Sequence, residues 1–234
     1  MRVVVPFAAE TPKTRLEPTL TAAERSAFAR AMLVDVLRAV VEAGHEPTVV
    51  STAPLSIADL ELPGEVEAAT SVTVDDRPLT EAVNARLPGG SESDADGDDG
   101  EDTEAVAVVM ADLALATPTA LEALFAADAD VAIAPGRAGG TNALVVREPA
   151  FRVDYHGASY LDHRELAREA GATLETVDSF QLATDIDEPD EIVEVLVHGH
   201  ETDRAPSYLR ELGFDLAERE GRVTAVRGEP AGSE

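Results

Sequence analysis

The chain has 234 residues, of which 44% are hydrophobic, and its 46 acidic and 18 basic side chains give a formal net charge of −28. So large a surplus of carboxylates excludes the clustered basic surface that a nucleic-acid-binding protein needs. The apolar share suffices for a folded core, so the acidity indicates a solvated surface suited to a salt-rich cytoplasm, where screening weakens repulsion between carboxylates. The absence of cysteine excludes disulfides and thiolate metal sites.

The length suits a single α/β domain over residues 1–234. No stretch approaches the roughly 20 apolar residues that span a bilayer, and the N-terminal sequence MRVVVPF lacks a signal cleavage site. We therefore expect a cytoplasmic protein with no membrane contact.

The first half of the chain predicts three strands and two helices. Apolar runs that are rich in β-branched residues indicate strands, and a capping-box pair, Thr21 and Glu24, followed by apolar residues at helical spacing, indicates a helix that Gly44 ends. The expected strands are 3–7, 47–52 and 71–74, and the expected helices are 21–43 and 80–86.

The second half continues the alternation of strand and helix. We expect strands at 105–110, 131–134, 143–146 and 174–177, helices at 117–126, 159–170, 189–198 and 205–212, and a final hairpin of 215–218 with 223–227. Such alternation predicts an α/β fold with a mostly parallel central sheet covered by helices on both faces. Ligands of such folds bind beyond the carboxyl ends of the strands.

Residues 88–104, with the sequence PGGSESDADGDDGEDTE, are too acidic to contribute to a core. We interpret them as a disordered acidic insertion within the domain and expect residues 228–234 to be a disordered tail. A calcium-binding loop is the alternative, since three aspartates alternate from Asp94. However, Asp99 stands where such a loop requires glycine and Ala105 where it requires glutamate.

The loop after the first strand contains two cations, Lys13 and Arg15, and Lys13 is the only lysine of the chain. Arginine offers a planar fork and lysine a compact charge, a combination that suits phosphate groups. The alternative is a pair of surface cations beside the following helix. Because all other basic residues are arginine, a single lysine suggests a task that a guanidinium group performs badly.

Three aspartates are candidate Mg²⁺ ligands. Asp112 follows the apolar strand that ends at Met110, and Asp185 and Asp187 lie two residues apart before a helix. Magnesium is typically held by one or two carboxylates together with water and substrate phosphates. Helix N-capping is the alternative for Asp112 and Asp187.

Two further segments offer groups that bind anions. The loop that contains Gly139, Gly140 and Thr141 supplies backbone N–H groups and a hydroxyl, and Gly157 and Ser159 precede a helix whose N-terminus favours an anion. Ser159 is alternatively an N-cap, and we interpret His163 as a packing or surface histidine.

These motifs together resemble the 2-phospho-L-lactate guanylyltransferase family of deazaflavin coenzyme F-420 biosynthesis, which is grouped with molybdenum-cofactor and sugar nucleotidyltransferases. The resemblance rests on VPF with PKTRL, AAERSAFARAML, VVMADLAL, GGTNALVV, HGASYLDH and TDIDEPDE, and it extends from Val3 nearly to His200. The chain departs from the family at Gly136, where members often carry an acidic residue, and at His156, where they carry glycine.

The resemblance implies a three-layer αβα nucleotidyltransferase fold, which is Rossmann-like and similar to the glycosyltransferase-A fold. It implies catalytic roles for Lys13 and Arg15, Mg²⁺ as the cofactor, and a possible homodimer. The implied Mg²⁺ ligands are Asp112, Asp185 and Asp187. The implied phospho-acid contacts are Thr141, Gly157 and Ser159, and the implied nucleotide contacts are Pro6, Phe7, Lys13, Arg15, Gly139 and Gly140.

The implied reaction transfers GMP from GTP to 2-phospho-L-lactate, releases pyrophosphate and forms lactyl-2-diphospho-5'-guanosine. The residues leave other functions open. Phosphoenolpyruvate or 3-phosphoglycerate would serve as acceptor in the same chemistry, and a non-catalytic nucleotide-binding domain would bind GTP without releasing pyrophosphate. A glycosyltransferase would also use an Asp-x-Asp metal site, although the cation pair of the first loop favours nucleotidyl transfer.

Overall fold

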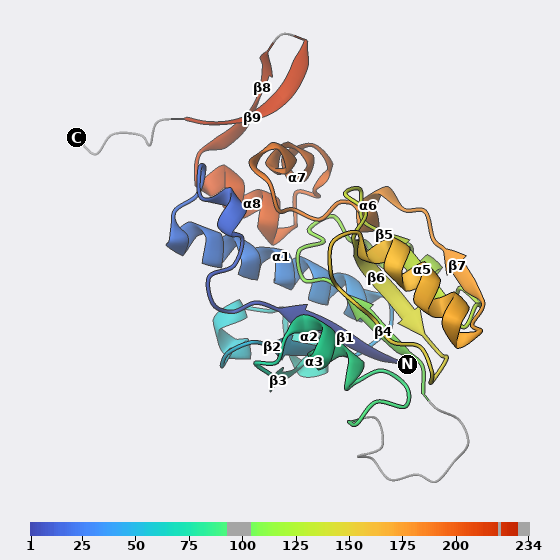
Figure 1. Cartoon of the computed structure of the whole chain (residues 1–234). Helices are drawn as coiled ribbons and strands as arrows, with labels where there is room; N and C mark the ends of the chain where they lie inside the picture. Colours follow the sequence, from blue (N-terminus) through green and yellow to red (C-terminus); the bar gives the residue numbers. More distant parts are fainter. Residues whose placement is uncertain (93–103, 220, 229–234) are drawn as a thin grey trace.

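The computed structural model describes residues 1–92, 104–219 and 221–228 of the chain (Figure 1). These residues form a seven-stranded sheet and a separate hairpin. The strands of the sheet are β1 (Arg2–Phe7), β2 (Pro47–Ser51), β3 (Ser71–Val74), β4 (Val106–Val109), β5 (Val131–Pro135), β6 (Thr141–Val146) and β7 (Leu174–Thr176). They lie in the order β3-β2-β1-β4-β6-β5-β7.

The strand order has a switch point between β1 and β4. From β1 the chain proceeds outward through β2 and β3, and it then returns to place β4 on the other side of β1. In open α/β sheets, a crevice for ligands forms beyond the carboxyl ends of the strands at such a point. The fold therefore directs attention to the loops that follow β1 and β4.

The sheet is mostly parallel, as the sequence predicts. Val4 of β1 pairs with Thr48 of β2 and Val108 of β4, both in parallel register. The exception is β6, which is antiparallel to both of its neighbours, β4 and β5. The antiparallel pairing of β6 was not predicted, because an apolar run of six residues does not indicate whether a strand pairs parallel or antiparallel.

The central strands are buried on both faces, which explains their continuous apolar sequences. Side chains alternate along β1 and β4 between two clusters of the core. Val3, Val5 and Val109 belong to one cluster, whereas Val4 and Val108 belong to the other. Each face of the sheet therefore needs a layer of helices to cover it.

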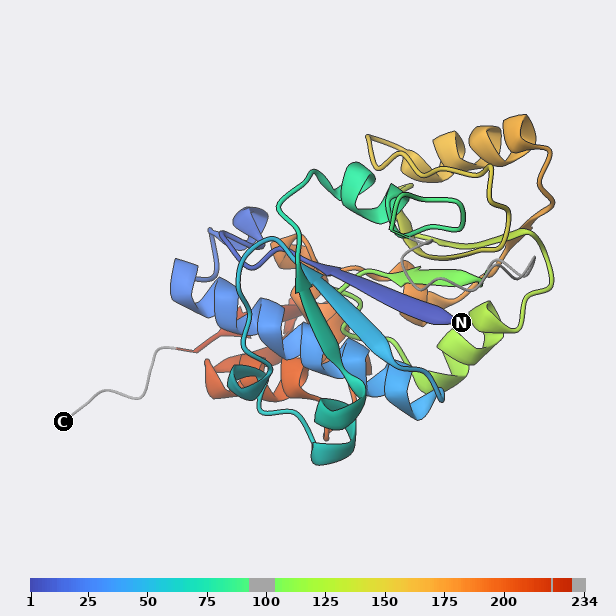
Figure 2. The same cartoon turned by 90° about the horizontal axis from the view of Figure 1, so that it is seen from below.

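The helices form these two layers, as Figure 2 shows. Helices α3 (Leu79–Asn84) and α5 (Ser159–Ala170) cover one face. The other face is covered by α1 (Ala22–Glu42), α2 (Gly64–Ala69), α4 (Pro118–Phe125), α7 (Ile192–His198) and α8 (Arg204–Glu211). The predicted three-layer architecture is thus confirmed.

Helix α1 is the longest element, and it begins where the sequence predicts. The Thr21 side chain accepts from the backbone N–H of Glu24, whose carboxylate accepts from the backbone N–H of Thr21. Its buried Asp35 accepts the backbone N–H groups of Arg204 and Ala205 at the start of α8, each at 2.8 Å. These bonds attach α8 to α1.

The predicted hairpin is confirmed as β8 (Phe214–Arg219) and β9 (Arg222–Arg227), which pair antiparallel around Gly221 at φ 74°. The predicted helix 189–198 is divided into a short 3-10 helix, η3 (Pro189–Glu191), and α7. Four short helices were not predicted, namely η1 (Thr14–Leu16), η2 (Ile57–Leu60), α2 and α6 (Phe180–Ala183).

The predicted acidic insertion and tail lie mostly outside the described residues, which omit 93–103 and 229–234. At the start of the insertion, Glu92 forms ion pairs with Arg77 and Arg86 and its backbone N–H donates to Ala85, so residues 88–92 contact the body of the domain. Within the described part of the chain, no helix is both long and apolar enough to cross a membrane.

Candidate active site

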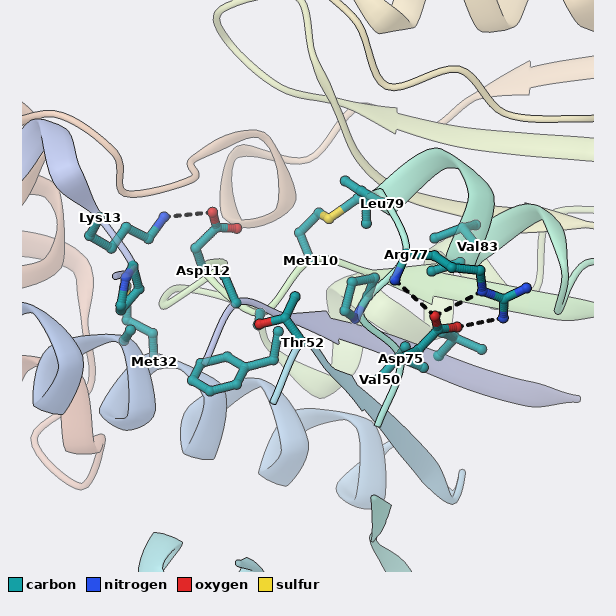
Figure 3. Close-up of a pocket in the computed structure, with 18 of the residues that line it drawn as sticks. Lys13, Met32, Val50, Thr52, Asp75, Arg77, Leu79, Val83, Met110 and Asp112 are labelled. Atoms are coloured by element: carbon teal, nitrogen blue, oxygen red, sulfur yellow. Dashed lines mark hydrogen bonds and ion pairs between the residues drawn. The ribbon is translucent and has the colours of Figure 1, made fainter. Parts of the chain in front are cut away.

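A pocket of about 320 Å³ lies at the switch point, beyond the carboxyl ends of β1 and β4. Its middle is lined by apolar side chains that include Val4, Pro6 and Met110, and its two ends are charged. Figure 3 shows Lys13 and Asp112 pointing toward each other at one end, and Asp75 paired with Arg77 at the other.

Lys13 connects two aspartates that are distant in sequence. Its Nζ atom lies 2.6 Å from Asp112 Oδ2 and 2.6 Å from Asp187 Oδ1. Only 9% of the Lys13 side chain is exposed. Burial by itself would lower the pKa of Lys13, but attraction to both carboxylates and the hydrogen bonds with them raise it above its ordinary value. The lysine is therefore held charged.

The backbone around Lys13 is strained. Lys13 has a φ of 55° and Thr11 a φ of 45°, in the left-handed region that residues other than glycine rarely adopt. Such conformations cost on the order of 1 kcal/mol each and concentrate at functional sites. They turn the loop after β1 so that Lys13 lines the pocket beside the preceding residue, Pro12.

Asp185 is the third predicted magnesium ligand, and Asn142 orients it. The Asn142 Nδ2 group donates to Asp185 Oδ1 at 3.0 Å and to the carbonyl of Leu182 at 2.9 Å. Burial raises the pKa of Asp185, and the charges of Asp112 and Asp187 add to the rise. Asp112 and Asp187 line the pocket, whereas Asp185 does not line it and is linked to the other two only by the repulsion between their charges.

Gly136 makes room for Asn142. A Cβ atom on Gly136 would lie 2.5 Å from Asn142 Oδ1, which is closer than real Cβ contacts allow. The departure from the family at this position therefore has a steric consequence, because an acidic side chain here would displace the asparagine that holds Asp185.

The site offers carboxylate oxygens, the ligand type that Mg²⁺ prefers. Asp112 Oδ1 is buried and has no hydrogen-bond partner in the described residues, so one acceptor is left for a cation. Among those same residues, no group of three or more Asp, Glu, His or Cys side chains is arranged to hold a metal ion. The Lys13 ammonium group lies between Asp112 and Asp187, where a cation would contact both.

The structure brings some of the remaining predicted nucleotide contacts to the pocket and leaves others outside it. Pro6 and Phe7 line it together with Lys13. Arg15 lies at its rim, with 66% of the side chain exposed, 3.7 Å from Asp187 and 3.5 Å from Glu188. Gly139 and Gly140 belong to the turn before β6, where the Gly136 N–H donates to the Gly140 carbonyl, and they do not line the pocket.

The predicted phospho-acid residues gather at the start of α5. The backbone N–H of Thr141 donates to Ser159 Oγ at 3.0 Å, so the first residue of β6 contacts the first residue of α5. Gly157, with a φ of 54°, is exposed in the turn just before this helix. Thr141 and Ser159 are each only 4% exposed, and neither lines the pocket.

Sequence reasoning missed several residues of the site. Asp75 and Arg77 form the second charged end of the pocket, and Asp75 follows β3, so the strand-end rule that identified Asp112 would also have indicated it. Asn142 left no such signal, because its importance comes from the partners that the fold gives it. His163, interpreted from the sequence as a packing or surface histidine, is fully buried and packs against Phe151 and Tyr155.

Residues 1–227 match the family model described as "Guanylyl transferase CofC like". The chain belongs to this family. The resemblance drawn from the sequence is thereby confirmed, and with it the assignment to the nucleotidyltransferases.

Named relatives agree with this family. A protein of Haloterrigena turkmenica named 2-phospho-L-lactate guanylyltransferase is 70% identical over 227 residues, which cover 97% of this chain and 97% of the relative. A protein of Natrialba magadii with the same name is 59% identical and covers 97% of this chain and 99% of its own.

A solved structure supports the fold. It comes from Desulfovibrio desulfuricans G20, and its name provisionally describes a nucleotide-diphospho-sugar transferase. The TM-score is 0.68 at 15% identity, with 90% of this chain and 94% of that chain covered. At this identity the likeness shows the fold alone.

Proposed function

We propose that this protein transfers GMP from GTP to 2-phospho-L-lactate, releasing pyrophosphate and forming lactyl-2-diphospho-5'-guanosine. The observation that carries the proposal is the convergence of Lys13, Asp112 and Asp187 at one end of a pocket at the switch point, in a chain 70% identical to a relative named for this reaction. GTP as the donor and a homodimeric state belong to the proposal and are supported by the family resemblance. The net charge of −28 supports a salt-rich cytoplasm as the location.

The chemistry suits a site that gathers charge and needs no base. A phosphate monoester has a second pKa near 6, so the phosphate of the acceptor is mostly dianionic at neutral pH and attacks the α-phosphorus directly. Catalysis then consists of bringing two anions together and neutralising them. Mg²⁺ held by Asp112, Asp185 and Asp187 would supply positive charge to the phosphate oxygens.

The side chains of the chain have separable roles in this proposal. Lys13, with two of its three ammonium hydrogens directed at carboxylates, keeps a third for a phosphate oxygen. Arg15 at the rim would receive the departing pyrophosphate, whose negative charge its exposed fork can contact in a bidentate manner.

The proposal is tested by pyrophosphate release. Purified protein in about 2 M KCl, where the Debye length falls to a few Å, is incubated with Mg²⁺, each nucleoside triphosphate and each phospho-acid. We expect GTP with 2-phospho-L-lactate to be the fastest pair. A preference for phosphoenolpyruvate or 3-phosphoglycerate would correct the acceptor, and tight GTP binding without pyrophosphate from any pair would exclude the enzyme.

Two matched variants test the metal site. Asp187→Asn should reduce turnover by at least about tenfold, the scale of a lost ligand-shell interaction, with an unchanged circular dichroism spectrum. Asp190→Asn removes an exposed carboxylate three residues further on and should leave turnover unchanged. Equal rates in the two variants would remove Asp187 from the site.

A further inference from the structure

His163 is buried between the start of β6 at Thr141 and the segment that precedes α5. It lies on the inner face of α5 with an exposed fraction of 0%, and edge-on ring contacts with Phe151 and Tyr155 surround it. Its Nε2 accepts the backbone N–H of Asp154 at 2.9 Å, and its Nδ1 lies 2.8 Å from Thr141 Oγ1.

These partners determine where the ring carries its proton. A backbone N–H can only donate, so Nε2 must be the unprotonated acceptor. A neutral imidazole then bears its hydrogen on Nδ1, which donates to the Thr141 hydroxyl oxygen. Burial lowers the pKa of His163 to about 4, so the ring stays neutral at physiological pH.

The tautomer in turn determines the role of Thr141. Because Thr141 Oγ1 accepts from the ring, its own hydrogen must point elsewhere, and it finds no acceptor among the described residues. Ser159 Oγ likewise accepts the Thr141 N–H and keeps a hydrogen without a described acceptor. A buried donor without a partner costs about 1–3 kcal/mol, which an oxygen of a bound ligand would recover.

We propose that His163 is a positioning residue of the phospho-acid site, whose Nδ1–H fixes the Thr141 hydroxyl as a donor to a phosphate oxygen of the acceptor. This inference rests on the proposed function, together with the phospho-acid contacts Thr141 and Ser159 that the family resemblance implies.

A purely structural role is the competing explanation, because His163 also attaches α5 to the segment before it. That segment also contacts α3: the backbone N–H of Tyr155 donates to Thr80 Oγ1, and Asn84 exchanges two hydrogen bonds with Val153. Loss of this attachment would disturb the site generally, so the two roles must be separated at the two ring nitrogens.

Two substitutions separate them. His163→Asn places an amide N–H near the position of Nδ1 and keeps the donor to Thr141, whereas His163→Gln places an amide oxygen near Nε2 and keeps only the acceptor for Asp154. We expect His163→Gln to raise the KM for the phospho-acid about fivefold to tenfold, the equivalent of one hydrogen bond. His163→Asn should stay within about twofold, and the KM for GTP should stay within about twofold in both.

A double-mutant cycle adds a second readout. Thr141→Val removes the hydroxyl, so adding His163→Gln to it should leave the KM for the phospho-acid at the value of Thr141→Val alone. The inference would be overturned if the KM increases of the two single variants multiplied in the double variant. It would also be overturned if His163→Gln raised the KM of both substrates equally, because His163 would then have a structural role.

The tautomer can be measured without turnover. Long-range proton–nitrogen NMR correlations of the wild-type histidine rings should show His163 protonated at Nδ1 at neutral pH, and protonation at Nε2 would overturn the inference even if no variant folds. Failure of the proposed function looks different. The wild-type protein would then release no pyrophosphate with any acceptor, whatever the variants do.

Discussion

Replacing Lys13 with methionine tests the site through protein stability. Methionine fills the volume of the apolar stem but leaves Asp112 and Asp187 without their shared cation. Removing one partner of a buried ion pair typically costs 3–5 kcal/mol. Because 37% of the Asp187 side chain is exposed, solvent screens part of that cost, and we take the lower end, about 3 kcal/mol. For a chain of this length, that corresponds to a melting temperature lower by roughly 6–12 °C.

Arg15→Met is the matched control, since it removes the other cation of the same loop. Arg15 is 66% exposed and its carboxylate contacts are 3.5–3.7 Å long, so its loss should cost less than about 1 kcal/mol. Urea unfolding in about 2 M KCl measures both variants, because buried pairs are screened less by salt than exposed ones. Adding Mg²⁺ should restore part of the loss in Lys13→Met only. Unfolding free energies of the two variants that agree within about 1 kcal/mol would refute the reasoning.

Four further outcomes are expected. Gly136→Ala should reduce turnover at least about fivefold, because its Cβ would displace Asn142 by contact at 2.5 Å; Gly64→Ala, with open space at its Cβ, is the control. Burial lowers the pKa of His163 from 6.5 to about 4, so the folded state favours the neutral ring. The contribution of this ring to the free energy of unfolding is therefore fully present above pH 6.5, and about 3 kcal/mol of it is lost as the pH decreases to 4. This component should be absent from urea titrations of His163→Gln. Transfer to dilute buffer should lower the melting temperature measured by calorimetry, because a net charge of −28 is then unscreened, and an unchanged value would contradict this interpretation. Lys13→Arg should lose turnover despite its preserved charge.

The strands and the aspartate after β4 could be predicted because each leaves a local pattern. A continuous run such as VAVV has only one stable place, the middle of a sheet covered on both faces, and it is buried there. Once such a strand is placed, the residue beyond its carboxyl end is placed with it. Asp112 was predicted in this way, and its contact with Lys13 follows from the adjacency of β1 and β4.

The features that could not be predicted depend on partners distant in sequence. The direction of β6 is set by pairing with β4 and β5, which its own residues do not encode. Asn142 orients Asp185 across 43 positions, and His163 contacts Thr141 across 22. Short helices such as α6 were missed because four residues carry no detectable period.

The single lysine now has a physical explanation that differs from the one expected. The sequence suggested a direct contact with phosphate, whereas the structure places the ammonium group between two carboxylates at 2.6 Å each. An ammonium group is a compact charge with three hydrogens directed apart, so it can contact oxygens on different sides at once. A planar guanidinium fork suits two oxygens of one carboxylate and would force these two aspartates apart. The position thus requires lysine for its geometry, and because two of the three hydrogens are used, the phosphate contact proposed for the third requires the same geometry.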